Sequence, residues 1–220
     1  MNRKRSAGFL CVVMTICIVA TYSVLPIILR PTASLRWDIE VGDEFIYQIV
    51  VHGYRIVEDP LNHSNVIYEP SFYAPMNNTE IRARIINLPA LGLWYSKSSF
   101  ASEVINQSKV NCTFDNGTSM QEEFSSVIVA VVSYCMLPVD DWTFLDALFP
   151  DSTTSAWYPG VYLSKFYTDC FSISYVLWPG DGLLSWTGNV SLASGMPLVA
   201  ERTIDSYDTG VHTLISIVLL

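Results

Sequence analysis

The sequence has few basic residues and few histidines. Its 220 residues include 12 Lys and Arg against 21 Asp and Glu, which gives a formal net charge of -9, and only three histidines. Four of the cations, Arg3, Lys4, Arg5 and Arg30, lie in or beside an N-terminal apolar segment, so the rest of the chain is more acidic than the total indicates. An acidic surface repels phosphate backbones, which argues against nucleic acid as a partner.

Motifs of catalytic and metal sites are also missing. The Gly-x-Ser-x-Gly turn that presents a nucleophilic serine does not occur. The histidines His52, His63 and His212 lack the spacing of metal ligands. Asp140 and Asp141 fit the acidic start of a helix better than a pair of glycosidase carboxylates. We therefore expect a non-catalytic protein with no cofactor and no metal site.

The first thirty residues indicate a membrane segment. Residues 6–29 carry no charge, and the basic tip at 1–5 precedes them. A bilayer core needs roughly 20 apolar residues of helix, and a basic flank stays on the cytoplasmic side. A cleaved signal peptide has a shorter apolar core. We expect a signal anchor at 1–30, a linker at 31–36 and an extracellular domain at 37–220, with secretion after signal cleavage as the alternative.

The domain beyond the anchor is rich in Asn-x-Ser/Thr sequons, which are acceptor sites for N-glycans. There are six of them, at Asn62, Asn77, Asn106, Asn111, Asn116 and Asn189. This number exceeds what the composition would give by chance, and it agrees with an exterior location. The sequons predict a glycoprotein, although an Asn-rich and Ser-rich composition with some unused sequons is the alternative.

The cysteines are less informative. Cys11 and Cys17 lie within the apolar segment, which leaves Cys112, Cys135 and Cys170 outside. An odd number permits one disulfide and one free thiol, and three pairings are open. Cys135 follows an apolar run and is expected to be buried, so our hypothesis is a disulfide between Cys112 and Cys170.

Alternation with a period of two predicts strands along most of the domain. The strands are predicted at 45–51, 81–85, 171–177, 184–192, 198–204 and 211–219. Trp186 lies on an apolar face of one of them and is expected in the core. The fold class is therefore mainly β (α+β), with a curved antiparallel sheet or half-barrel and one or two short covering helices.

Four segments depart from this pattern. Residues 126–137 are apolar on both faces, which predicts a central strand covered on each side. Residues 139–149 have acidic residues at the start and apolar residues at helical spacing, which predicts a short amphipathic helix that covers the sheet. The polar segment 59–78 is predicted to be a long loop or excursion between the first two strands, and 152–160 is predicted to be a second loop.

Aromatic and apolar side chains around this helix suggest a binding surface. Trp142, Leu145 and Phe149 lie at helical spacing, and the pair Trp157 and Tyr158 lies in the following loop. Core packing is the default for Trp142, whereas a loop pair has less packing to explain it. We predict that these five residues line a groove for a ligand.

Short motifs resemble known proteins. Trp37, followed by Gly42-Asp43 and then Phe45-x-Tyr47, resembles the opening strand of uncharacterised archaeal surface proteins that are membrane-anchored or secreted. The block 175–183 is similar to that group and to lipoprotein-carrier half-barrels of the LolA/LppX type. That resemblance implies a curved antiparallel sheet that wraps helices around an apolar groove. It implies no activity and no binding residues.

These observations predict a membrane-anchored extracellular glycoprotein domain that is held by residues 6–29. It would bind a lipid or another apolar or amphipathic ligand, or a surface protein partner, in a groove between its sheet and the helix at 139–149. One alternative is a structural or adhesive component of the cell envelope without a ligand. A second alternative is a secreted hydrolase.

Overall fold

The computed structural model describes residues 34–59, 62–92, 95–149, 161–177, 182–206 and 210–220. Residues 34–220 form one compact unit. The predicted anchor at 1–30 lies outside the described residues, and so do the loop at 152–160 and its pair Trp157 and Tyr158. Among the residues that the structure describes, no helix has the length and apolar character that crossing a bilayer requires.

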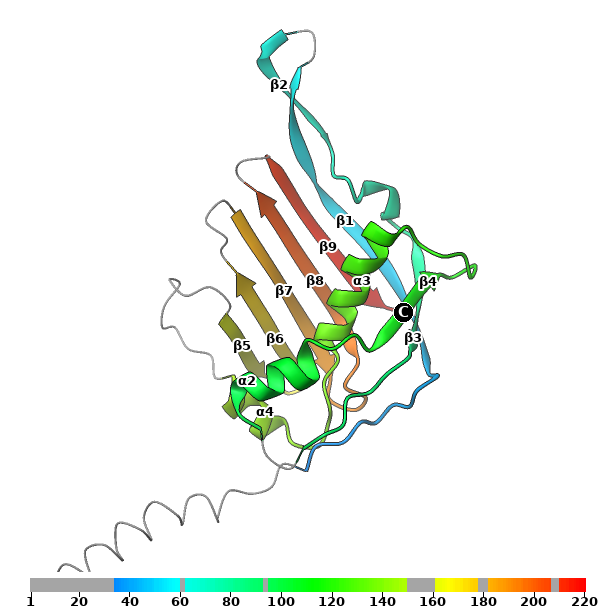
Figure 1. Ribbon diagram of the computed structural model, residues 1–220, viewed down its shortest axis with the longest axis vertical. Coiled ribbons are helices and arrows are strands. Elements are labelled where there is room, and N and C mark those ends of the chain that lie inside the picture. Colours follow the sequence, from blue (N-terminus) through cyan, green and yellow to red (C-terminus); the bar gives the residue numbers. More distant parts are fainter. Residues whose placement is uncertain (1–33, 60–61, 93–94, 150–160, 178–181, 207–209) are drawn as a thin grey trace, which may run out of the picture. The chain divides into compact units, whose positions relative to one another are not determined.

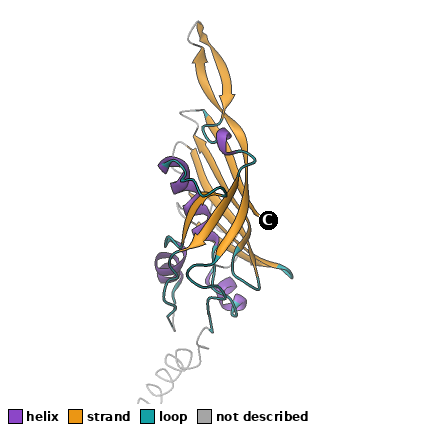
Figure 2. Ribbon diagram, turned by 90° about the vertical axis from the view of Figure 1, so that its right-hand side faces the viewer, coloured by secondary structure: helices purple, strands orange, loops and turns teal. Residues whose placement is uncertain are grey.

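The described residues form one antiparallel sheet of nine strands, so the mainly β prediction is confirmed (Figures 1 and 2). Its strands are β1 (Glu44–Asp59), β2 (Asn62–Pro70), β3 (Glu80–Ile85), β4 (Val110–Phe114), β5 (Val161–Phe166), β6 (Cys170–Leu177), β7 (Gly182–Ser191), β8 (Pro197–Ser206) and β9 (Val211–Leu219). The spatial order is β4-β3-β1-β9-β8-β7-β6-β5, and β2 pairs with β1 outside this path. The sheet is open, with β4 and β5 at its two ends. All six strands predicted from alternation are present.

Strand β1 is long enough to have two neighbours on one edge. Residues 44–48 pair with β3, and residues 54–59 pair with β2 in a hairpin that extends beyond the rest of the sheet (Figure 1). The loop predicted at 59–78 is therefore wrong, because β2 occupies 62–70. Its apolar residues Val66, Ile67 and Tyr68 are consecutive and exposed, so the strand lacks the alternation that a half-buried strand shows.

The described helices are short except for one. They are the 3₁₀-helix η1 (Ala74–Met76), α2 (Lys97–Phe100), the π-helix η2 (Ala101–Ile105), α3 (Glu122–Cys135) and α4 (Trp142–Leu148). Helix α4 confirms the amphipathic helix predicted at 139–149. Asp141 is its N-cap, and the carboxylate accepts a hydrogen bond from the Phe144 backbone N–H at 3.0 Å.

The central strand predicted at 126–137 is wrong, because most of this segment belongs to helix α3. Phe124, Ile128, Val131 and Cys135 are buried at spacings of three and four residues, which is the periodicity of one helix face. Apolar residues also occupy other positions of the helix, where Val127, Val129 and Ala130 are half-buried, which is why the sequence resembled a strand covered on both sides. Helix α3 lies across β7 and β8 (Figure 1), and we call this side of the sheet the helix-covered face.

Close contact between α3 and the sheet depends on a glycine. A Cβ atom at Gly188 of β7 would lie 2.5 Å from the Cys135 Sγ atom, so a larger residue would force the Cys135 side chain or the helix to shift. The predicted burial of Cys135 is confirmed.

The predicted disulfide between Cys112 and Cys170 is not formed. Both residues are free thiols, as is Cys135. Cys112 lies on β4 and Cys170 begins β6, and five other strands separate these two in the sheet. A disulfide joins residues whose Cα atoms lie within about 7 Å, which strands so far apart do not provide. Burial raises the pKa of the Cys112 thiol to about 12.

Candidate ligand-binding pocket

The side chains predicted to line a groove on α4 are part of the core. Trp142, Leu145 and Phe149 are all buried. The Trp142 ring lies 5.2 Å from the Phe171 ring of β6, and the Phe149 ring lies 5.3 Å from the Tyr162 ring of β5, measured between centroids. These contacts fill the space between α4 and the sheet, so the predicted groove is closed at this helix.

A pocket of about 370 Å³ lies instead at the end of α3, on the helix-covered face of β5 to β8. Its lining residues are Asn106, Tyr134, Tyr162, Tyr175, Leu184, Trp186 and Arg202. Tyr134 comes from the last turn of α3, and Asn106 follows η2. The volume is at the lower end of the range for small-molecule sites.

The register of the sheet assembles one wall of this pocket. Tyr162 pairs with Tyr175, Tyr175 pairs with Trp186, and Trp186 pairs with Arg202 across four consecutive strands. Directly paired residues in an antiparallel sheet project from the same face. The four side chains therefore form a single row, which we call the Tyr-Tyr-Trp-Arg row.

The aromatic members of the row contact one another. The ring centroids of Tyr162 and Tyr175 are 4.6 Å apart, and those of Tyr175 and Trp186 are 6.1 Å apart with an interplanar angle of 22°. Tyr134 packs on Trp186 from the helix side at 5.8 Å. The Tyr162 hydroxyl donates a hydrogen bond to the Asn106 Oδ1 atom at 2.8 Å. Burial raises the pKa of Tyr162, which keeps this hydroxyl protonated.

Arg202 is the one charged group among the described lining residues. Its Nε atom is buried and has no hydrogen-bond partner among the residues that the structure describes. Burial lowers the pKa of Arg202, but an arginine side chain remains a cation at neutral pH. The neighbours that pair with Arg202 on its two sides are Trp186 and Ile215, so an aromatic and an aliphatic side chain flank the guanidinium group.

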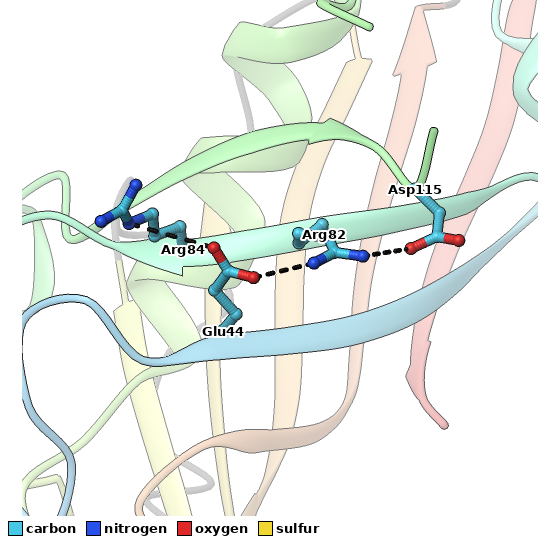
Figure 3. Close-up of polar contacts among 4 residues, drawn as sticks. All are labelled: Glu44, Arg82, Arg84 and Asp115. Atoms are coloured by element: carbon cyan, nitrogen blue, oxygen red, sulfur yellow. Dashed lines mark hydrogen bonds and ion pairs between the residues drawn. The ribbon is translucent and has the colours of Figure 1, made fainter. Parts of the chain in front are cut away.

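Arg82 shows how a surface arginine of the same sheet is satisfied (Figure 3). Its Nη1 atom donates to the Glu44 Oε2 atom and its Nη2 atom donates to the Asp115 Oδ1 atom, both at 2.9 Å. Arg82 alternates with the buried residues Ile81 and Ala83, so it projects away from the helix-covered face. Arg202 projects toward that face, where none of the described lining residues is acidic.

One lining residue of this pocket, Trp186, was singled out by the sequence, but as a core residue and not as a ligand contact. Trp186 was predicted in the core, and its burial confirms that prediction. The signal for the pocket was Arg202, because it occupies an inward position in the alternation between Ala200 and Ile204. A charged residue on the apolar face of a strand is the unusual observation that points to a site.

No protein family, curated protein or solved structure matches this chain.

Proposed function

We propose that this protein binds a small apolar or amphipathic ligand in the pocket lined by Tyr134, Trp186 and Arg202. The observation that carries the proposal is the Tyr-Tyr-Trp-Arg row, which places three aromatic side chains and one cation along the wall of a single cavity. Aromatic side chains offer large contact areas to apolar and planar groups, and small-molecule sites combine such walls with a few polar groups.

We place this pocket in an extracellular domain that residues 6–29 anchor to a membrane. The exposed positions of the sequons support this part of the proposal. The described side chains of Asn77, Asn106, Asn111, Asn116 and Asn189 are all exposed, which leaves them accessible for glycan attachment. The side chain of Asn62 lies outside the described residues. The half-barrel architecture suggested by the resemblance to lipoprotein carriers belongs to the same proposal.

The experiment is a titration of the full chain, in a membrane mimic, with a neutral fluorescent apolar dye. Substitution L184W fills the pocket, because Leu184 is one of its lining residues. The matched control is L183W, since the next residue on β7 projects from the opposite face. We expect saturable binding that L184W abolishes and L183W preserves. An absence of saturable binding, or equal binding by both variants, would refute the proposal.

A second candidate function is adhesion to a surface partner through the β1–β2 hairpin. Val66, Ile67 and Tyr68 of β2 are 58%, 40% and 64% exposed, which is unusual for consecutive apolar residues. They pair with residues 56–58 of β1, beyond Arg55, where the pairing of β1 with β9 ends. Substitution V66E would then weaken self-association or adhesion without changing dye binding, as measured by sedimentation velocity and titration.

A further inference from the structure

Arg202 adds a positively charged group to a pocket whose other walls are mostly aromatic, and this charge bears on the kind of ligand that would fit. Its buried Nε atom has no described hydrogen-bond partner, and its paired neighbours Trp186 and Ile215 offer no acceptor. Arg202 is half-buried as a whole, but burying an N–H donor such as its Nε–H without a partner is costly, so such a donor is normally paired with an acceptor. We propose that the ligand supplies this acceptor as an anionic group, a carboxylate or a phosphate, while its apolar body contacts the aromatic wall. The inference rests on the proposed function of the pocket.

The alternative for an aromatic pocket is a cationic ligand. Tyr and Trp rings attract quaternary ammonium groups through the negative faces of their π systems. Sites of that kind exclude fixed positive charge, whereas here Arg202 lies in the same row as Tyr175 and Trp186. None of the described lining residues is acidic, so nothing in the lining offsets the repulsion between Arg202 and a cation.

The remaining polar groups of the pocket also favour an acceptor ligand. The Asn106 Oδ1 atom already accepts the hydrogen bond from the Tyr162 hydroxyl. The Trp186 indole only donates, the Tyr134 and Tyr175 hydroxyls can donate, and a guanidinium group presents a planar fork of donors that matches a carboxylate or a phosphate. The donors of this lining therefore suit an anion better than a neutral or cationic head group.

The test uses three small soluble probes with one apolar body. They are 4-phenylbutyrate, its neutral amide and the corresponding 4-phenylbutyl trimethylammonium ion, titrated calorimetrically into the full chain in a membrane mimic. A hydrogen bond to a charged group predicts that the carboxylate binds about 10- to 100-fold more tightly than the amide. A fourth probe, 4-phenylbutyl phosphate, distinguishes a preference for phosphate from one for carboxylate.

Variants assign the preference to Arg202. We expect R202Q to remove the difference between carboxylate and amide and to leave the amide affinity nearly unchanged. R202K retains the charge and is expected to keep part of the preference. The control R82Q removes an exposed arginine that projects away from the pocket, so the preference should persist.

The outcomes separate the two levels of the proposal. Equal binding of carboxylate and amide by the wild-type protein, or tighter binding of the ammonium probe, would overturn the anionic preference while the pocket still binds apolar ligands. If neither these probes nor the neutral dye binds, the proposed function fails and the inference fails with it. A preference that persists in R202Q would show that another group binds the anion.

Discussion

Lys109 is a fully buried lysine whose replacement gives a sharp test of the packing between the helices and the sheet. Its Nζ atom donates to the backbone oxygens of Ser133 at 2.7 Å, Ile105 at 3.0 Å and Gln107 at 3.4 Å. Ser133 lies in the last turn of α3, and Ile105 is the last residue of η2. The amino group therefore satisfies carbonyl groups at the C-terminal ends of two helices, although burial makes its positive charge costly.

We expect K109M to lower the free energy of unfolding by about 2 to 4 kcal/mol at low pH. Methionine retains an unbranched side chain of similar length, so the main loss is the donor. Each buried carbonyl that loses its partner costs about 1 to 3 kcal/mol. The cost is smaller at Ser133, because its backbone oxygen still accepts a hydrogen bond from the Met136 N–H at 3.3 Å. Removing a buried charge also offsets part of the loss.

The same lysine predicts how stability depends on pH. Burial lowers the pKa of Lys109 from 10.5 to about 7. Between these values the unfolded chain binds a proton that the folded chain has released, so stability rises with pH by up to about 1.4 kcal/mol per unit. Cys112 acts in the opposite direction above pH 9, its ordinary pKa, because burial raises its pKa to about 12. The effect of Lys109 is therefore cleanest between about pH 7 and about pH 8.5.

Urea unfolding from about pH 6 to about pH 8.5, followed by tryptophan fluorescence, measures both effects. The wild-type protein should gain stability over the upper part of this range, and K109M should show no such gain. The control K165M removes an exposed lysine of β5 and should retain the wild-type slope. An unchanged slope in K109M, or a K109M protein more stable than the wild type at pH 6, would refute the reasoning.

Three further predictions concern packing, capping and modification. G188A should cost about 1 to 3 kcal/mol in urea unfolding, because the new Cβ atom would meet the Cys135 side chain, and C135A should reduce this cost in a double-mutant cycle. D141A should cost about 1 kcal/mol through loss of the α4 cap, whereas D141N should retain most of the stability in the same assay. N189Q should lower the mass of protein from a glycosylating host by one glycan, and the non-sequon control N87Q should not.

The strands were predictable where one face of the sheet is buried. In β9, Thr213, Ile215 and Ile217 are buried while their neighbours are half-buried, and this difference appears directly as alternation in the sequence. Strand β2 was missed because it pairs beyond the core, where no buried face imposes a pattern. Strand β2 exists because β1 continues past the end of its pairing with β9 and so offers a free stretch to pair with. The length of that stretch cannot be predicted from sequence periodicity.

Helix α3 was missed for the opposite reason, because too much of it is apolar. Val127, Val129 and Ala130 are half-buried although they lie away from its most buried face, so both helical and strand periodicity fit the segment. The acidic pair Glu122 and Glu123 in the first turn was the available helix signal, since negative charge is favourable at a helix N-terminus. A length of 14 residues also favours a helix over a strand.

The pocket required information that periodicity does not contain. Tyr162, Tyr175, Trp186 and Arg202 lie on four different strands, and they form a row only in the register that the sheet adopts. A slip of one residue in any of these pairings would send part of the row to the other face of the sheet. Predicting all four strands correctly would therefore still not predict the pocket. Arg202 was nevertheless detectable alone, because its place between Ala200 and Ile204 puts a cation on an apolar face. Its Nε atom is buried and finds no acceptor among the described residues, so this position was the sequence's best pointer to the pocket.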